Sequence, residues 1–425
     1  MNRSRLHAVS AVLALAAAIS PQQSHADEHD EQDKQALSQS IHDFGMKLYD
    51  EVASTSRNSS LSPASVSMAL AMALMGARGE TASEMAKTLG LKAPTQRCRC
   101  LRGGEWTPER LQRALGALLK DLNSPAERSG VQIVNDVWGQ QGYGFLQGYA
   151  DLLERSGASL REVDFAGSPD ASRRAINAHV ARKTHNRIMD LLPHGSVTPI
   201  VRQILTNAVY FRARWASEFW RGATEAREFT RLNGAAVQVD MMRQRDRFFY
   251  AESPDLQVLR MGYDDSRLQM FLLLPRAGRS LEVARRALDR GAMDEWMNRS
   301  RYREVIVSLP RVEFESSFSL SAALKEMGMD RAFDLSRCDF SGINGGVEPL
   351  PIADVAHKTF VKMDEEGTEA AAATAVLVCG SAIAEPEAPA IFQADRPFLF
   401  AIRDPASGLL LFVGHVVDPS PASTR

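Results

Sequence analysis

The stretch of residues 364–396 constrains this chain most, because it holds few side chains able to fill a core. An acidic turn ending in Gly367 leads into a run of very small residues, Thr368 to Ala375, and two prolines follow. Alanine favours helix, but the flanking glycine and prolines oppose one. In a strand, alternate residues from Thr368 to Val378 share a face without charge or bulk. The segment therefore suits either a tight slot within a sheet or an exposed linker.

The first 26 residues have the pattern of an export signal. Arg3 and Arg5 give a positive start, the apolar stretch after them is too short to span a bilayer, and small residues precede a cleavage site after Ala26. We predict a signal peptide over residues 1–26, a flexible N-terminus over 27–36, and a secreted or periplasmic protein. An arginine excess typical of a GC-rich genome indicates a bacterial source.

The rest of the chain has the composition of one globular unit. It has 425 residues, of which 44% are apolar and 24% charged. Helical patterns come first, strands follow, a hairpin ends the chain, and no repeat or linker divides it. We therefore predict a single α+β domain over residues 37–419 with a tail at 420–425. A net charge of −2 gives no reason to expect nucleic acid or membrane as a partner, and we expect a monomer.

Local sequence signals predict where some helices and strands begin and end. Ser62, followed by Pro63, is the expected N-cap of an apolar helix over 66–75, and Thr81 is the expected N-cap of the next helix. We further expect a helix over 168–192 and a strand over 305–315.

The four cysteines are predicted to be mostly free thiols. Cys98 and Cys100 are too close in sequence for an unstrained bond, and they lack the second ligand pair of a zinc finger. Both lie in a basic insertion, residues 92–106, which we interpret as a surface loop, with a polyanion site as the alternative. Cys338 and Cys379 are far apart in sequence.

The sequence contains no motif of a known enzyme active site. It has no G-x-S-x-G elbow, S-x-x-K pair, H-E-x-x-H helix or Walker loop, although spacing alone leaves a dispersed Ser/His/Asp triad open. His357 differs from the other histidines because it lies on an apolar strand shortly before Glu365. We expect it to be buried and held by hydrogen bonds. We predict no enzyme activity, no metal and no cofactor.

Several segments, taken in order, resemble the serpin family of serine protease inhibitors, from Leu37 to Pro419. They are Leu61–Leu70, Ile188–Pro193, Leu205–Phe211 with Trp215, Asp339–Ile343, Asp354–Lys358, Asp364–Ala372, Ala394–Phe400 and Gly414–Pro419. The chain departs from the family at Asn186 and Ala213, where glycine is common. Asparagine tolerates the same positive φ. The insertion at 92–106 is particular to this chain.

The resemblance implies three β-sheets, about nine helices and an exposed reactive-centre loop, here about Gly367 to Ile391. In the family a target protease cuts this loop and forms an acyl-enzyme. The cut loop then inserts as a strand into the central sheet and distorts the protease. Small residues at 368–375 suit such an insertion, so we predict an inhibitor that forms a covalent complex with its target serine protease.

By the same resemblance, three groups of residues support the insertion. The shutter is a hydrogen-bond cluster where the sheet parts, the breach is the place where the loop first enters, and the hinge begins the loop. They are the shutter residues Ser62, Ser65, Asn207 and His357; the breach residues Trp215, Arg311 and Glu365; and the hinge residues Glu365, Gly367, Thr368, Glu369, Ala370, Ala371 and Ala372.

The specificity of the loop follows from where it is cut. Counting from Glu365 places the scissile bond at Ser381–Ala382, and a slip of one or two residues gives Gly380–Ser381 or Ala382–Ile383. Each choice offers a small residue, and residues 368–391 contain no Arg or Lys. We therefore predict elastase-like or subtilisin-like targets. The alternatives are papain-like cysteine proteases, and a non-inhibitory carrier or chaperone with this fold.

Overall fold

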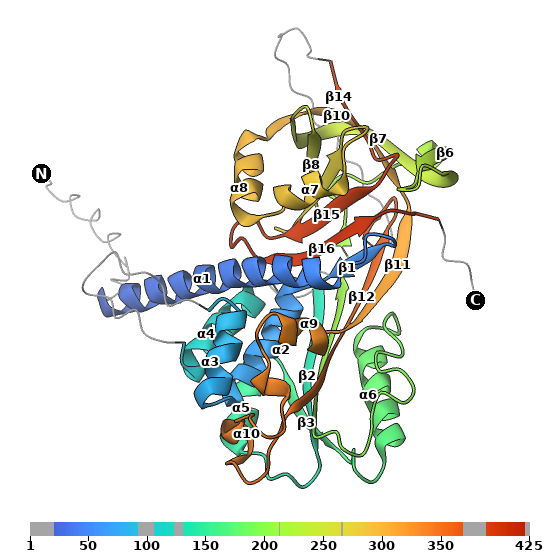
Figure 1. Cartoon of the computed structure of the whole chain (residues 1–425). Helices are drawn as coiled ribbons and strands as arrows, with labels where there is room; N and C mark the ends of the chain where they lie inside the picture. The colour runs from blue at the N-terminus through green and yellow to red at the C-terminus, as the bar shows by residue number, and fades with distance from the viewer. Residues whose placement is uncertain are drawn as a thin grey trace, which may run out of the picture.

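The computed structural model describes residues 21–91, 106–122, 131–211, 213–264, 267–368 and 388–420 (Figure 1). A cluster of helices and the helix α6 cover opposite faces of one sheet, and a second, larger sheet with α7 and α8 lies at the other end. The described helices are α1 Pro21–Val52, α2 Pro63–Gly76, α3 Gly79–Thr88, α4 Pro108–Leu122, α5 Gln147–Arg155, α6 Pro169–Lys183, α7 Leu281–Ala287, α8 Arg290–Arg299, α9 Ser321–Glu326 and α10 Ser341–Asn344.

Helix α2 is buried along its whole length, as its uniformly apolar sequence predicts. The predicted cap is confirmed: the Ser62 side chain accepts a hydrogen bond from the Ser65 N–H, and Pro63 occupies the first turn. The predicted cap of α3 is wrong. That helix begins at Gly79, and the Thr81 hydroxyl instead accepts the Asp339 N–H at 2.9 Å.

Helix α1 includes residues 27–36, which we expected to be a flexible N-terminus. Ion pairs to α4 explain the difference, because they hold this end of the helix against the domain. Lys34 contacts Asp121 at 2.7 Å, and Arg110 contacts Asp33 at 2.6 Å. Within the described residues no helix is long and apolar enough to cross a membrane.

The described strands form three hydrogen-bonded sheets, and the α+β prediction is confirmed. The nine-stranded sheet runs β1-β16-β15-β9-β8-β7-β10-β14, with β6 paired to β7. Its strands are β1 Ser59–Leu61, β6 Glu225–Thr230, β7 Ala236–Glu252, β8 Leu256–Gly262, β9 Gln269–Pro275, β10 Arg301–Pro310, β14 Ala390–Gln393, β15 Phe398–Arg403 and β16 Leu410–Val416.

The five-stranded sheet has the order β11-β12-β4-β2-β3, and a separate pair joins β13 to β5. Their strands are β2 Val131–Gln140, β3 Ser159–Val163, β4 Gln203–Phe211, β5 Ala213–Arg214, β11 Val312–Ser319, β12 Ile352–Met363 and β13 Gly367–Thr368. One face of this sheet packs on the main core with α2, and the other packs on α6. Both faces are therefore shielded from water.

Three predicted element boundaries are wrong. The helix expected over 168–192 ends at Lys183, and the predicted positive φ of Asn186 is confirmed at 60° just beyond that end. The strand expected over 305–315 is two strands, because Arg311 separates β10 from β11 and each joins a different sheet. The loop expected to reach Ile391 ends earlier, because Ala390 and Ile391 pair with β10 as part of β14.

Candidate functional site

The structure brings the four predicted shutter residues into one buried cluster. Ser62, Ser65, Asn207 and His357 are each 0% exposed. The Ser62 N–H donates to His357 Nε2 at 3.1 Å, and the other ring nitrogen, Nδ1, contacts Asn207 Oδ1. Since Nε2 accepts, Nδ1 carries the proton and donates to the amide oxygen. His357 is therefore neutral and uses both of its nitrogens.

Asn135 completes this cluster and was not predicted from the sequence. It lies on β2 directly opposite Asn207 on β4, and Asn207 lies opposite His357 on β12. Asn207 Nδ2 donates to Asn135 Oδ1 at 2.5 Å and also contacts the Ser65 hydroxyl. The Ser65 hydroxyl in turn donates to Asn135 Oδ1 at 3.1 Å. One polar row thus crosses three neighbouring strands and is anchored to the start of α2.

Complete burial explains why this row carries no charge. Desolvation lowers the pKa of His357 to about 3, despite its hydrogen bond to Asn207. A protonated ring would lose Nε2 as an acceptor and leave the Ser62 N–H unpaired in the core. The hydrogen bonds of this row therefore require a neutral His357.

The predicted breach residues also meet, where the chain leaves β12. Arg311 donates two hydrogen bonds to the Glu365 carboxylate, from Nε at 2.9 Å and from Nη2 at 2.6 Å. The Thr224 hydroxyl donates a third at 2.5 Å. Burial alone would raise the pKa of Glu365, but these hydrogen bonds outweigh it and hold that pKa below its ordinary value. Glu365 is therefore buried and charged, and Thr224 is a further partner of its carboxylate that the sequence did not reveal.

Trp215 holds the backbone of the same turn. Its indole N–H donates to the Asp364 carbonyl at 3.0 Å, and its own backbone N–H donates to the Glu366 carbonyl at 3.0 Å. The ring stacks on Tyr263, with centroids 4.9 Å apart. The Phe219 N–H donates to the Glu365 carbonyl at 2.8 Å. These bonds fix the direction in which the chain leaves the turn.

Two of the described hinge residues pair with the short strand that follows the central strand β4. Gly367 and Thr368 form β13, which lies antiparallel to β5, directly after β4 in sequence. Gly367 has a φ of +154°, and an added Cβ would lie 2.2 Å from the Ala213 carbonyl oxygen. Only glycine fits this approach.

The boundary between β4 and β12, which we call the seam, ends next to the β5–β13 pair, because β5 follows β4 and β13 follows β12 in the chain. The two strands are parallel, with Ile352 to Phe360 paired to Gln203 to Tyr210. The Asn207–His357 contact crosses the seam in the interior of the sheet. A strand that continued from β13 would run antiparallel to both of its neighbours.

The other predicted site residues lie outside the described part of the chain. They are Glu369, Ala370, Ala371, Ala372, Ser381 and Ala382. Cys98, Cys100 and Cys379 lie outside it as well. Cys338 is a free, half-buried thiol, and burial raises its pKa.

A family model described as serpin, serine protease inhibitor, matches residues 39–419. The chain belongs to the serpin family. A curated relative, an uncharacterized serpin-like protein of Thermococcus kodakarensis, is 39% identical over 381 residues, which cover 89% of this chain and 85% of the relative. Human Serpin B8 is 36% identical over 370 residues, covering 86% of this serpin and 94% of the relative.

Solved structures of serpins agree with the fold. Human thyroxine-binding globulin in complex with thyroxine has a TM-score of 0.79 and 26% identity, and the match covers 92% of this serpin and 100% of that chain. Native protease nexin-1 with heparin has a TM-score of 0.78 at 24% identity, covering 91% and 100%. Thyroxine-binding globulin and protease nexin-1 thus share this architecture.

Proposed function

We propose that this serpin is an irreversible suicide-substrate inhibitor of extracellular serine proteases. A target protease cuts the loop after the hinge, forms an acyl-enzyme, and is displaced when the loop inserts into the seam before deacylation. The observation that carries this proposal is β13. It starts an antiparallel strand at the mouth of a parallel seam, in line with a segment of very small residues.

Strand pairing supplies the driving force for this mechanism. Closed, the seam has one parallel set of hydrogen bonds between β4 and β12. An inserted strand replaces it with two antiparallel sets, which are slightly more stable per residue. A net gain of about eight hydrogen bonds at about 1 kcal/mol each is on the order of ten kcal/mol. That is enough to distort a protease's catalytic loop.

The two polar clusters have different tasks in this proposal. The shutter residues hold the seam shut, and their neutral hydrogen bonds break and re-form as β4 and β12 separate. The breach residues keep the turn at 364–366 in place, so that the hinge enters from one fixed end. Arg311 suits this task because it lies between the two sheets and grips Glu365 with two nitrogens.

The proposed targets are elastase-like or subtilisin-like enzymes, with cleavage at Ser381–Ala382. The absence of Arg and Lys from residues 368–391 supports this assignment, because trypsin-like enzymes require them in the primary pocket. Papain-like cysteine proteases are the second candidate class. We further propose that the protein acts as a monomer outside the cytoplasm after removal of residues 1–26. Sequencing the N-terminus of the exported protein tests that cleavage.

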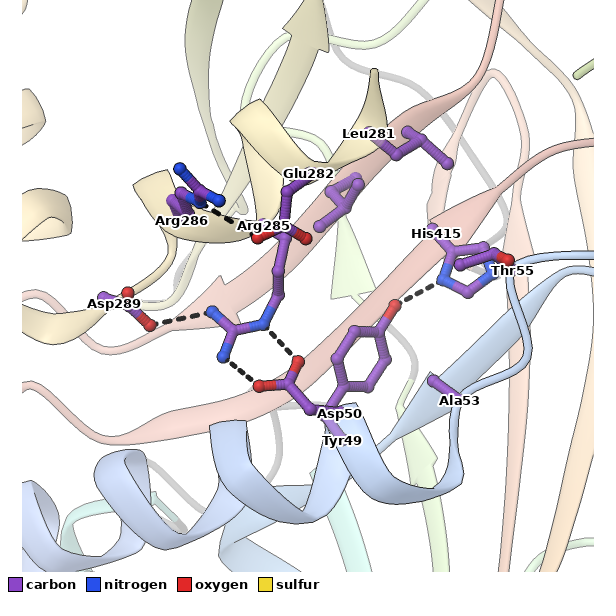
Figure 2. Close-up of a pocket in the computed structure, with 11 residues that line it drawn as sticks. Tyr49, Asp50, Ala53, Thr55, Leu281, Glu282, Arg285, Arg286, Asp289 and His415 are labelled. Atoms are coloured by element: carbon purple, nitrogen blue, oxygen red, sulfur yellow. Dashed lines mark hydrogen bonds and ion pairs between the residues drawn. The ribbon is translucent and has the colours of Figure 1, made fainter.

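A carrier function is the alternative that the relationship to thyroxine-binding globulin raises, and a cavity of about 610 Å³ between α1, α7 and β16 bears on it (Figure 2). Arg285 is bound to Asp50 at 2.5 Å and to Asp289 at 2.8 Å, and Arg286 is bound to Glu282 at 3.0 Å. Both guanidinium groups are thus paired with carboxylates, Arg285 with two and Arg286 with one. Among the described residues that line the cavity, neither Arg285 nor Arg286 is left uncommitted for an anionic ligand, which favours the inhibitor.

Incubation of the mature protein with pancreatic-type elastase and with subtilisin tests the proposal. We expect an adduct that survives denaturing electrophoresis, with one peptide released per adduct. Sequencing that peptide identifies the scissile bond. Clean cleavage of the loop with full protease activity remaining would refute the inhibitor and leave the carrier.

A further inference from the structure

Three arginines line one side of β7. Arg243, Arg245 and Arg247 alternate along the strand, so their side chains leave the same face, and all three are exposed. Their partners across β10 are Ser308, Ile306 and Glu304 in that order. The arginines therefore form a column of cations on the outer surface of the nine-stranded sheet.

An exposed aromatic pair continues this column. Phe249 lies opposite Tyr302, with ring centroids 5.3 Å apart, and their exposures are 39% and 54%. Arg247 lies over the Tyr302 ring at 5.0 Å. One strand further, Ile391 of β14 pairs with Ile306 and is 61% exposed. Exposed tyrosine, arginine and apolar groups in one patch are the composition of protein–protein interfaces.

The charge on this patch is only partly balanced. Glu304 accepts two hydrogen bonds from Arg245, at 2.8 and 3.1 Å. Arg247 donates to the Tyr302 backbone carbonyl at 3.2 Å. Within the described residues, the exposed Arg243 guanidinium makes no hydrogen bond or ion pair. The nearby Asp246 alternates to the other face of β7, where it binds Ser217. Three guanidinium groups against one carboxylate leave a positive surface.

This surface adjoins the proposed reactive-centre loop. β14 is the first strand after the loop, and the Arg303 guanidinium donates to the Ala388 carbonyl at 2.9 Å. Figure 1 shows β14, β10 and β7 together at one end of the molecule. Ala382 lies eight residues before Ala390, so the bond is at most about 29 Å away along the chain. A protease domain of about 230 residues is about 45 Å across, so a protease bound at that bond is large enough to reach the patch.

We infer that the arginine–aromatic face, made of Arg243, Arg245, Arg247, Phe249, Tyr302 and Ile391, is a docking surface for the target protease. This inference rests on the proposed function. It assigns the partner a surface with an acidic rim and an apolar centre, beside its active-site cleft. The arginines accelerate encounter by electrostatic attraction, and the aromatic pair prolongs the encounter complex by burying apolar area.

The test compares two triple variants with equal changes in net charge. In the first, Arg243, Arg245 and Arg247 are changed to Gln. In the control, three exposed arginines on the helices α4 and α6 are changed to Gln: Arg113, Arg174 and Arg182. Association rate constants and adduct yields are measured with one subtilisin-like protease of negative and one of positive net charge, at 0.05 and 0.5 M NaCl.

We expect the first variant to associate about tenfold more slowly with the negatively charged protease at low salt, with the adduct yield unchanged. The loss shrinks at high salt, and the control keeps the wild-type rate. The double variant Phe249→Ala/Tyr302→Ala loses several-fold in rate at both salt concentrations. Because all five side chains are exposed, these variants keep the fold, which thermal unfolding checks.

Several outcomes overturn the inference. Equal losses in the two triple variants would mean that net charge alone matters. Unchanged rates combined with weaker retention of the first variant on immobilised heparin would identify a polyanion site instead. If adducts form normally in all variants at the wild-type rate, the docking surface is wrong and the inhibitor stands. If even the wild-type protein forms no adduct, the proposed function itself fails.

Discussion

The shutter and the breach are two polar clusters in one protein, and they are built from different chemistry. The shutter is neutral, formed by Ser, Asn and His side chains without exposure to solvent. The breach is charged, and the side chain of Arg311 is 43% exposed while that of Glu365 is 4% exposed. Removing an ion pair from water carries a large desolvation penalty. A charged pair is therefore tolerated at the rim of the sheet, where Arg311 stays partly hydrated, whereas the interior uses neutral hydrogen bonds.

The difference matches the motion that the proposal demands. Neutral hydrogen bonds re-form with new partners at little cost, because no charge has to be desolvated when the strands part. A bidentate guanidinium–carboxylate pair is stronger and more directional, so it suits an anchor that stays in place. Four predictions test this contrast, in decreasing order of expected effect.

The largest effect, on adduct yield, is expected at Thr368, the hinge residue that ends β13 just after the breach. In Thr368→Arg a charge would have to enter the sheet interior, which desolvation opposes. We expect the loop to be cut at a normal rate while almost no adduct forms, so that the variant behaves as a substrate and not as an inhibitor. Denaturing electrophoresis of the reaction products measures it. Thr198→Arg, at an exposed site, is the control, and a Thr368→Arg variant that still traps protease would disprove insertion.

The second prediction breaks the shutter at its centre. Asn207→Leu removes the partner of His357, Ser65 and Asn135 and leaves buried polar atoms unpaired. We expect the free energy of unfolding to fall by about 3 kcal/mol, measured from the urea midpoint. The matched change Asn298→Leu, on the exposed side of α8, should stay within about 0.5 kcal/mol. Similar losses in the two variants would contradict a special role for the row.

The third prediction weakens the breach while keeping its shape. Glu365→Gln removes the charge that Arg311 and Thr224 bind, and we expect a loss of about 2 kcal/mol in unfolding free energy. Arg311 has a second acidic partner, Asp240, which is 57% exposed, so Asp240→Asn should cost about 0.5 kcal/mol or less. Urea titrations of both variants at 0.05 and 0.5 M NaCl measure these two losses. Salt screens the exposed Asp240 pair more than the buried Glu365 pair. Equal losses would show that burial does not set the strength of the anchor.

The fourth prediction uses pH to separate the neutral cluster from the charged one. The folded pKa of His357 is about 3, below the ordinary value near 6.5, so the unfolded state binds the proton first. The stability from this site is complete above about pH 6.5 and is lost as the pH falls toward 3. In His357→Gln the slope of unfolding free energy between pH 6 and 4 should fall by about 1.4 kcal/mol per pH unit.

His42, His179 and His415 also have lowered pKa values because they are buried. They leave the variant with a residual slope and so provide an internal reference. Glu365 adds to this slope only near and below its own ordinary pKa of about 4.3. Because its folded pKa is lowered, its stabilisation is complete above that pH and is lost as the pH falls further. An unchanged slope in the His357 variant would mean that the row is not the acid-sensitive part of the sheet.

Local sequence determined the features that depend on a residue and its near neighbours. The small side chains at 368–375 follow from composition, and the Ser62 cap and the positive φ of Asn186 follow from local backbone chemistry. Family motifs supplied the shutter and breach residues, and the structure brings each set together. Short-range physics is enough for such features, since their partners lie within a few residues or in a recognisable motif.

The tertiary structure alone decided which distant residues meet. Asn135 joins the shutter only because β2 pairs with β4 in a register that places it opposite Asn207. Arg311 separates two strands of different sheets, although its sequence context suggested one continuous strand. The arginine–aromatic face likewise exists only because β7, β10 and β14 are neighbours. Strand register is set by the packing of the whole core, and no window of sequence contains that information.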